Sequence, residues 1–435
     1  TKKAKTGDEI TGSFTVDDDV LATPTATIQT KAATVAVDGA HPNYTAKYTL
    51  IGTDTEGAVA FTLDFSDETG NAATTVTAVT DATSVTFDRT LPTATSVSIA
   101  SDNANTAAAT TGDEITISFT VDDDLLATPT ATIQTKAATV AVDGAHPNYT
   151  AKYTMIGTDT EGAIAFTLDF TDEAGNAATQ VTAVTDASSV TSDRTAPTAT
   201  AVSIASNNAT STVAKTGDEI TVSFTVDDDM LATPTATIQS QTATVAVAGA
   251  HPNYTAKYTM TGTDTEGAIA FTLDFSDEAG NAATQVTAVT DATSVDYDRT
   301  LPTATSVSIV SDNANTAKAK SGDEITVSFT VDDDMLATPA ATIQSQTATV
   351  AVAGAHPNYT AKYTMTGTDT EGAVTFTLDF SDEAGNAATQ ITAVTDATSV
   401  DFDRTAPTAT AVTIVSDNAN TAVAKAGDEI TVSFT

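Results

Sequence analysis

The chain has 435 residues with 57 Asp and Glu against 17 Lys and Arg, which gives a formal net charge of −40, and it contains no Cys and no Trp. A surface this acidic repels the phosphates of nucleic acids and of anionic lipids, so neither is expected as a partner. Without Cys no disulfide can staple the fold, and each domain must be large enough to bury a core of its own. No apolar stretch is long enough to span a membrane.

A short proline-containing phrase recurs along the chain at a constant spacing. It begins at Asp88, Asp193, Asp298 and Asp403, which are 105 residues apart. This period exceeds the roughly 20–50 residues of a solenoid unit and matches a small autonomous domain. The sequence therefore predicts a tandem array of similar domains with the boundaries 1–90, 91–195, 196–300, 301–405 and 406–435.

The repeat at 91–195 carries the strand pattern of the whole array. In Glu114–Val121, the apolar residues Ile115, Ile117, Phe119 and Val121 alternate with polar ones, which indicates a half-buried strand. In chain order the expected strands are A (96–100), B (114–121), C (130–134), D (138–142), E (149–156), F (163–170) and G (178–191). No segment has helical periodicity. The pattern predicts an all-β fold in which each repeat is a seven-stranded immunoglobulin-like (Ig-like) β-sandwich. The first repeat then lacks strand A, and the last contains only strands A and B.

The segment 193–200 is expected to join one domain to the next. Pro197 lies just before the following strand A, where a residue without a backbone donor stiffens a short linker. Thr1 falls in the middle of a repeat and Thr435 inside a strand, so we expect a segment of a longer repetitive protein.

The D-E-A-G-N turn at 172–176 and the D-R-T-A-P phrase at 193–197 resemble the bacterial Ig-like repeats of very large surface adhesins. Such repeats carry a D-x-A-G-N turn and a D-x-T-A-P linker. The resemblance covers every repeat and implies an extracellular or cell-surface stalk, often stiffened by calcium between domains. This chain departs from such proteins in having no glycine-rich nonapeptide calcium repeats and no ligand-binding module.

Carboxylates gather at the predicted ends of each sandwich. In an Ig-type fold the B–C and F–G loops share one pole, and the A–B and E–F loops lie at the other pole. Stacking successive domains would bring these loops together, and carboxylate oxygens are ligands that calcium prefers. Alternatively, they are solvated turn residues, because Asp and Asn favour turns. The candidate ligands at the first pole are Asp122, Asp123, Asp124, Asp172 and Glu173, with their counterparts Asp227, Asp228, Asp229, Asp277 and Glu278; those at the opposite pole are Asp113, Glu114, Asp159, Glu161 and Asp193.

Three other residues recur once per repeat. His146 has no Cys or nucleophile motif beside it, so we expect it to shape a turn rather than bind zinc or catalyse a reaction. Lys152 should point outward from strand E as a solvated lysine rather than form an isopeptide bond. The Asn-Tyr-Thr sequons are candidate N-glycosylation sites, although chance matches are expected in a Thr-rich chain. They lie at Asn43, Asn148, Asn253 and Asn358.

The sequence favours a structural function over a binding or a catalytic one. Near-identical repeats suit an extracellular rod or filament, such as a surface fibre or adhesin stalk, whose partners are other copies of itself or other surface proteins. The alternative is an adhesive module that recognises glycans or surfaces through its loops. That alternative needs exposed aromatic residues, whereas aromatics make up 6% of the chain and fall mostly at inward strand positions. Nothing in the repeat assembles a nucleophile, a base and a pocket, so we do not expect an enzyme.

Overall fold

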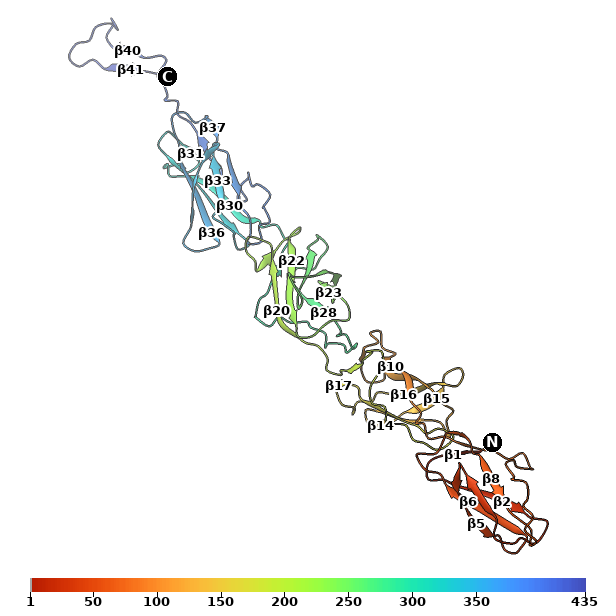
Figure 1. The fold of residues 1–435 in the computed structure, drawn as a ribbon. Helices are drawn as coiled ribbons and strands as arrows, with labels where there is room; N and C mark the ends of the chain where they lie inside the picture. Colours follow the sequence, from red (N-terminus) through yellow and green to blue (C-terminus); the bar gives the residue numbers. More distant parts are fainter. Residues whose placement is uncertain (1) are drawn as a thin grey trace. The chain divides into compact units, whose positions relative to one another are not determined.

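A computed structural model of the chain describes residues 2–435 and contains strands and turns, with no helix among these residues (Figure 1). This confirms the all-β prediction. By its contacts the chain divides into two compact units. One unit consists of Thr1–Ala199, Val226–Thr235 and Asp274–Val286, and the other of Thr200–Thr225, Ala236–Leu273 and Thr287–Thr435.

The second repeat, which lies wholly in the first unit, shows the fold of one sandwich. Its largest sheet is antiparallel, in the order β10 (Ala94–Ser101), β12 (Glu114–Val121), β16 (Asn148–Thr154) and β15 (Thr139–Val142). The second sheet has the order β14 (Lys136–Ala137), β13 (Thr130–Ile133) and β18 (Phe166–Asp169). A third small sheet has the order β11 (Ala108–Ala109), β19 (Thr191–Ser192) and β17 (Gly162–Ala163). The first sheet thus follows the A-B-E-D order of Ig domains, as the sequence predicts.

The other repeats build the same sheets, except that the first has no strand A. The first repeat contains β1 (Lys2–Ala4), β2 (Glu9–Thr15), β3 (Thr25–Ile28), β4 (Lys31–Ala32), β5 (Thr34–Val37), β6 (Asn43–Thr49), β7 (Gly57–Ala58), β8 (Phe61–Asp64) and β9 (Val85–Phe87). The third contains β20 (Ala199–Ser206), β21 (Val213–Ala214), β22 (Glu219–Val226), β23 (Thr235–Ile238), β24 (Gln241–Thr242), β25 (Thr244–Val247), β26 (Asn253–Thr259), β27 (Gly267–Ala268), β28 (Phe271–Asp274) and β29 (Asp296–Tyr297). The fourth contains β30 (Ala304–Ser311), β31 (Lys318–Ala319), β32 (Glu324–Val331), β33 (Ala340–Ile343), β34 (Gln346–Thr347), β35 (Thr349–Val352), β36 (Asn358–Thr364), β37 (Gly372–Ala373), β38 (Phe376–Asp379) and β39 (Asp401–Phe402), and β40 (Thr413–Ser416) and β41 (Ile430–Ser433) follow it.

The core of each sandwich is built by the period-two pattern seen in the sequence. In β12 the side chains of Ile115, Ile117, Phe119 and Val121 are each at most 2% exposed, while the residues between them are half-buried. Burying one such side chain contributes roughly 1.5–3 kcal/mol. The alternation therefore fixes which face of the strand turns inward and, with it, the register of the sheet.

Two predicted strands differ from the structure. Strand F (163–170) is divided, because Gly162–Ala163 pairs with β19 whereas Phe166–Asp169 pairs with β13. Strand G (178–191) is mostly irregular. Its hydroxyl groups cover the outer edge of β10 instead: the Val97 amide donates to Thr185 Oγ1 and the Ile99 amide to Ser188 Oγ, both at 2.9 Å. The segment can do this because its Thr and Ser hydroxyl groups accept hydrogen bonds from the edge amides of β10. Period-two alternation in the sequence does not predict such contacts.

The second repeat differs from the others at a core position near its end. Phe87, Tyr297 and Phe402 occupy equivalent sites near the end of their repeats, and each is 1% exposed. In the second repeat this position is Ser192, which is 2% exposed and whose Oγ lacks a hydrogen-bond partner among the described residues. A buried hydroxyl without a partner is unfavourable, and the aromatic ring contributes far more apolar area.

Replacing Ser192 by Phe should therefore stabilise the second repeat by about 1–3 kcal/mol. Hydrogen exchange of the β17 and β19 amides in the whole chain would measure the local gain. The matched control is Tyr297→Ser, which should destabilise the third repeat by about 3–5 kcal/mol. Faster exchange in Ser192→Phe would mean that the surrounding residues have already closed over the serine and that the ring overpacks the site.

Candidate metal centre at the joints between repeats

The acidic F–G turn is ordered by its own Asp and Asn. In the second repeat the Asn176 backbone amide and its Nδ2 donate to the two carboxylate oxygens of Asp172, both at 2.8 Å. Gly175, with φ of 88°, supplies the left-handed conformation that closes the turn. Asp172 is fully buried, at 0% exposure. The D-E-A-G-N sequence therefore forms a rigid turn that holds one carboxylate inside it.

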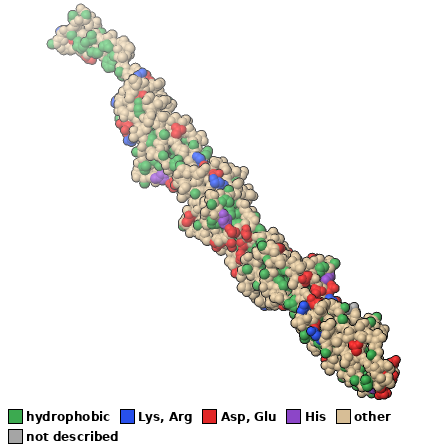
Figure 2. All heavy atoms as spheres, in the orientation of Figure 1, with side chains coloured by type: hydrophobic (Ala, Val, Ile, Leu, Met, Phe, Trp, Pro, Cys, Tyr) green, Lys and Arg blue, Asp and Glu red, His purple; other side chains and the backbone are tan. Residues whose placement is uncertain are grey.

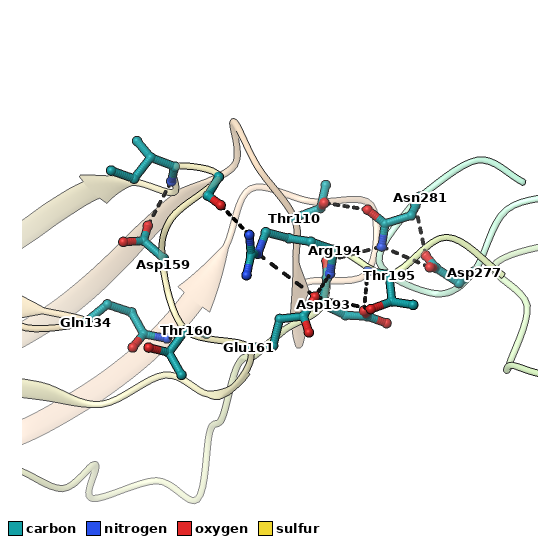
Figure 3. Close-up of polar contacts among 12 residues, drawn as sticks. Thr110, Gln134, Asp159, Thr160, Glu161, Asp193, Arg194, Thr195, Asp277 and Asn281 are labelled. Carbon is teal, nitrogen blue, oxygen red and sulfur yellow. Dashed lines mark hydrogen bonds and ion pairs between the residues drawn. The ribbon is translucent and has the colours of Figure 1, made fainter.

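The same turn contacts the preceding repeat, and we call this contact a joint. At the first joint, Asn176 Nδ2 donates to the backbone oxygen of Asp88 at 3.1 Å. Asn281 makes the same bond to Asp193 at the second joint, at 3.1 Å (Figure 3). Asn386 makes it to Asp298 at the third joint, also at 3.1 Å. The first two joints lie within one compact unit and the third within the other.

Three carboxylates meet at each joint. At the second joint, Asp193 of the linker, Asp228 of the B–C loop and Asp277 of the F–G turn each place an oxygen within 4.8 Å of the others. Asp277 is 1% exposed, and the other two are half-buried. Asp88, Asp123 and Asp172 form the same triad at the first joint, and Asp298, Asp333 and Asp382 form it at the third.

These triads concentrate negative charge. Two unit charges 4 Å apart repel by about 1 kcal/mol in bulk water and by more where water is partly excluded. At the third joint, burial together with the charges of Asp382 and Asp333 raises the pKa of Asp298. Oxygen-only donors with a net negative charge are the set that a hard divalent cation such as calcium takes. The triad residues are thus the ones that could hold a metal ion.

The linker before each joint is fixed to its own repeat. The Arg194 backbone amide donates to Glu161 Oε1 at 3.0 Å, and its guanidinium donates to the backbone oxygen of Gly157 (Figure 3). Thr195 Oγ1 also donates to Glu161 Oε1, at 3.3 Å. The Arg and Thr of the recurring phrase therefore bind the E–F loop, which positions Asp193 in the triad.

The linker is also fixed to the repeat that follows. The Thr198 backbone amide and hydroxyl donate to the two carboxylate oxygens of Asp227, at 2.6 and 2.5 Å. Asp122 binds Thr93 in the same way, and Asp332 binds Thr303. Pro197, between the two attachments, is buried. The first Asp of each D-D-D run thus accepts hydrogen bonds from the linker and is not a member of the triad.

Five of the predicted ligands belong to triads: Asp123, Asp172, Asp193, Asp228 and Asp277. The triads at the first and third joints also include Asp88 and Asp298, the linker residues equivalent to Asp193, which were not among the predicted ligands. On the face drawn in Figure 2, acidic side chains gather in separate groups. Whether any triad binds calcium stays a prediction.

Among the remaining candidates, several side chains bond within their own repeat. Asp159 accepts from the Tyr153 hydroxyl at 3.0 Å and from the Ile156 amide at 2.8 Å, so it shapes the E–F loop. Glu114 pairs with Lys152 on the outer face of the sheet, as expected for a solvated lysine. Asp113 accepts from Asn103 Nδ2 at 2.7 Å.

Others lie at the rim of the joint. Asp124 Oδ1 is 3.7 Å from His146 Nδ1, and Glu173 Oε2 is 3.4 Å from Lys3 Nζ. Glu278 donates its backbone amide to the Asp229 carbonyl at 3.1 Å, which links the F–G turn to the B–C loop.

Further joint contacts were not predicted from sequence. Asn103 Nδ2 donates to the Ala279 carbonyl at 2.8 Å, and Thr110 Oγ1 donates to Asn281 Oδ1 at 2.6 Å. At the first joint the residue equivalent to Thr110 is Lys5, and its Nζ donates to the Gly175 carbonyl at 2.6 Å. The sequence shows that residues of the A–B loop differ between repeats, but this difference does not indicate which residues they contact.

The sequon side chains are exposed in all four repeats: Asn43, Asn148, Asn253 and Asn358. Thr120 Oγ1 donates to the amide oxygen of Asn148 at 2.8 Å, which leaves the amide nitrogen pointing away from that contact. Glycosylation stays a prediction.

Comparisons with known proteins show no close relative. No family model and no curated protein sequence matches the chain. Among solved structures, immunoglobulin domains 1–4 of Sidekick-1 share 10% identity with a TM-score of 0.24, over 93% of this chain and 96% of that one. SGBP-B of the Bacteroides ovatus mixed-linkage glucan utilization locus, in complex with a mixed-linkage heptasaccharide, shares 15% identity with a TM-score of 0.17, over 84% of this chain and 86% of that one. At such scores the Ig-like assignment rests on the strand order described above. No helix in the described residues is long and apolar enough to cross a membrane.

Asn281→Ala should loosen the second joint, because it removes the bond to the Asp193 carbonyl as well as the bonds inside the turn. A lost buried hydrogen bond costs about 1–3 kcal/mol. The chain has no Cys, so a pair of introduced, spin-labelled cysteines on either side of the joint would report the distance distribution, which should broaden. Asn71→Ala is the matched control, because Asn71 makes the same turn bonds to Asp67 in the first repeat. Equal broadening at the second joint in both variants would contradict the role of Asn281.

Acid should break the contact between Thr198 of the linker and Asp227. Hydrogen bonds from the Thr198 side chain and backbone lower the pKa of Asp227, so its ionised form is favoured in the folded state. The stabilisation is complete above the unfolded pKa of about 3.9 and is lost as the pH falls through the lower folded value. The protection factor of the Thr198 amide, which compares its exchange with the intrinsic rate at the same pH, should therefore fall below about pH 4. In Asp227→Asn this fall should be absent; its persistence there would assign the effect to another group.

Proposed function

We propose that this chain is part of an extracellular structural array, a surface fibre or adhesin stalk, whose joints are stiffened by calcium. The observation that carries the proposal is the recurrence of one triad of carboxylates at three joints, each built from the linker, the B–C loop and the F–G turn. The resemblance of the turn and linker to bacterial surface repeats supports the same function, and so does the high negative charge, which keeps repetitive chains apart in solution.

The chemistry favours a cation at these positions. Three carboxylates supply up to six oxygens, and calcium accepts six to eight from ligands of flexible geometry. A bound ion would replace mutual repulsion by shared coordination and would tie the linker to both loops of the next repeat. Extracellular modules bind calcium at about 10⁻⁴–10⁻³ M, so millimolar external calcium would occupy the sites. The partners are then other copies of the chain or other surface proteins.

A glycan-binding module is the weaker candidate. Stacking on sugars needs exposed aromatic rings, whereas Phe119 and Tyr149 of the second repeat pack against each other in the core, 2% and 6% exposed. We propose no catalytic activity for the chain.

Calcium and Asp228→Asn test the proposal together. In chelator, Asp228→Asn should raise the melting temperature, because it removes one repelling charge from the second joint. With calcium at tenfold above the dissociation constant, the parent should gain about 1.4 kcal/mol per site, and the variant should lose that gain at one joint. Asp18→Asn is the matched control, because Asp18 is the equivalent residue of the first repeat and belongs to none of the described triads. If calcium changes neither the melting temperature nor the small-angle scattering of the parent, the triads are solvated acidic surface.

A further inference from the structure

The first joint differs from the others in having a lysine beside its triad. Lys3 Nζ lies 3.9 Å from Asp123 Oδ1 and 3.4 Å from Glu173 Oε2, and its side chain is only 27% exposed. Lys3 belongs to the repeat before the joint, and both carboxylates belong to the repeat after it. The ammonium group therefore spans the joint at the point where the triad carboxylates meet.

The other joints have no charge at this position. The residue 105 positions later is Ala108, and the next is Val213, so the second and third joints present an apolar side chain there. The triads themselves are unchanged, with the same three Asp at each joint. At the third joint Lys215 Nζ donates to the backbone oxygen of Gly385 at 2.8 Å, as Lys5 does to Gly175 at the first joint. Among the described residues, a lysine forms an ion pair with a triad carboxylate at the first joint alone.

We infer that Lys3 acts as a built-in cation at the first joint, which makes this joint independent of calcium, whereas the second and third joints require an external divalent ion. The inference rests on the proposed function and refines it by dividing the joints into two classes. An ammonium group of the chain seated against the triad also marks the position as one that accepts positive charge, which an acidic cluster alone would not.

The two classes follow from competition for the same oxygens. A lysine carries three donors and a single charge, and its position beside Asp123 adds repulsion to any divalent ion that approaches this triad. A tethered ammonium also has a high effective concentration, because it needs no association step. At the second and third joints Ala108 and Val213 offer neither donor nor charge, so an ion meets no lysine at this position. The Lys215 ammonium group at the third joint donates to the Gly385 carbonyl and not to a triad carboxylate.

Counting bound calcium tests this directly. Equilibrium dialysis of the whole chain against radioactive calcium at several millimolar should find two ions per chain that depend on triad residues. Lys3→Gln, which removes the charge and keeps most of the side-chain length, should raise the number to three. Val213→Lys should lower it to one, and Ala108→Lys is a second variant of the same kind. Position 318 already carries a lysine in the fourth repeat, 3.0 Å from Asp401, so the fold accommodates this side chain.

Asn substitutions assign each ion to its joint. Asp228→Asn should remove one ion from the parent chain. Asp123→Asn should remove none from the parent but one from the Lys3→Gln variant. Each comparison is a difference between two chains with the same acidic surface, so calcium that this surface binds loosely cancels.

The possible failures are distinguishable. If the parent binds three ions and Lys3→Gln leaves the number unchanged, the inference about Lys3 is overturned while calcium joints stand. If neither Asp228→Asn nor Asp333→Asn lowers the count in any background, the triads do not bind calcium, and the proposed function fails together with the division into classes.

Discussion

The buried carboxylate of the F–G turn, Asp172 in the second repeat, is the group on which each joint depends. It accepts two hydrogen bonds from Asn176, and this fixes the turn. The fixed turn aims Asn176 at the carbonyl of Asp88 in the preceding repeat. The same carboxylate then becomes the least exposed member of the triad. One side chain thus orders the loop, orients the contact and supplies the charge, so neutralising it would affect all three.

The linker is held by specific bonds rather than by proline alone. Arg194 and Thr195 bind Glu161 and Gly157 of the preceding repeat, and Thr198 binds Asp227 of the next. Pro197 limits the backbone between these attachments. A segment fixed at both ends leaves little freedom for Asp193, which explains how a half-buried linker carboxylate can be kept near two others despite the repulsion.

Near-identical repeats do not make identical joints. The triad and the Asp–Asn turn recur without change, but the residues around them vary. Lys3 and Lys5 reach across the first joint, whereas Ala108 and Thr110 stand in their places at the second. Ser192 replaces a core aromatic ring close to the second joint as well. Some substitutions among copies therefore lie at the ends of the repeats, where they alter the joints. Others lie in the sheets, such as Gly12 in β2, where the second repeat has Ile117 in β12.

The repeat length, the all-β class and the inward face of strands such as Glu114–Val121 could be predicted from the sequence, because period-two alternation and a 105-residue recurrence are local or direct properties of the chain. Ig topology also indicated the linker and the B–C and F–G loops, which supply the triads. It indicated the A–B and E–F loops as well, and those supply no member of the described triads. Which carboxylates meet depends on the folded chain. Asp227 and Asp228 are neighbours in one acidic run, yet one closes the linker and the other joins the triad. That difference depends on side-chain direction and on partners about 30 residues or more away, such as Thr198 and Asp277. Neither can be predicted from a run of identical residues.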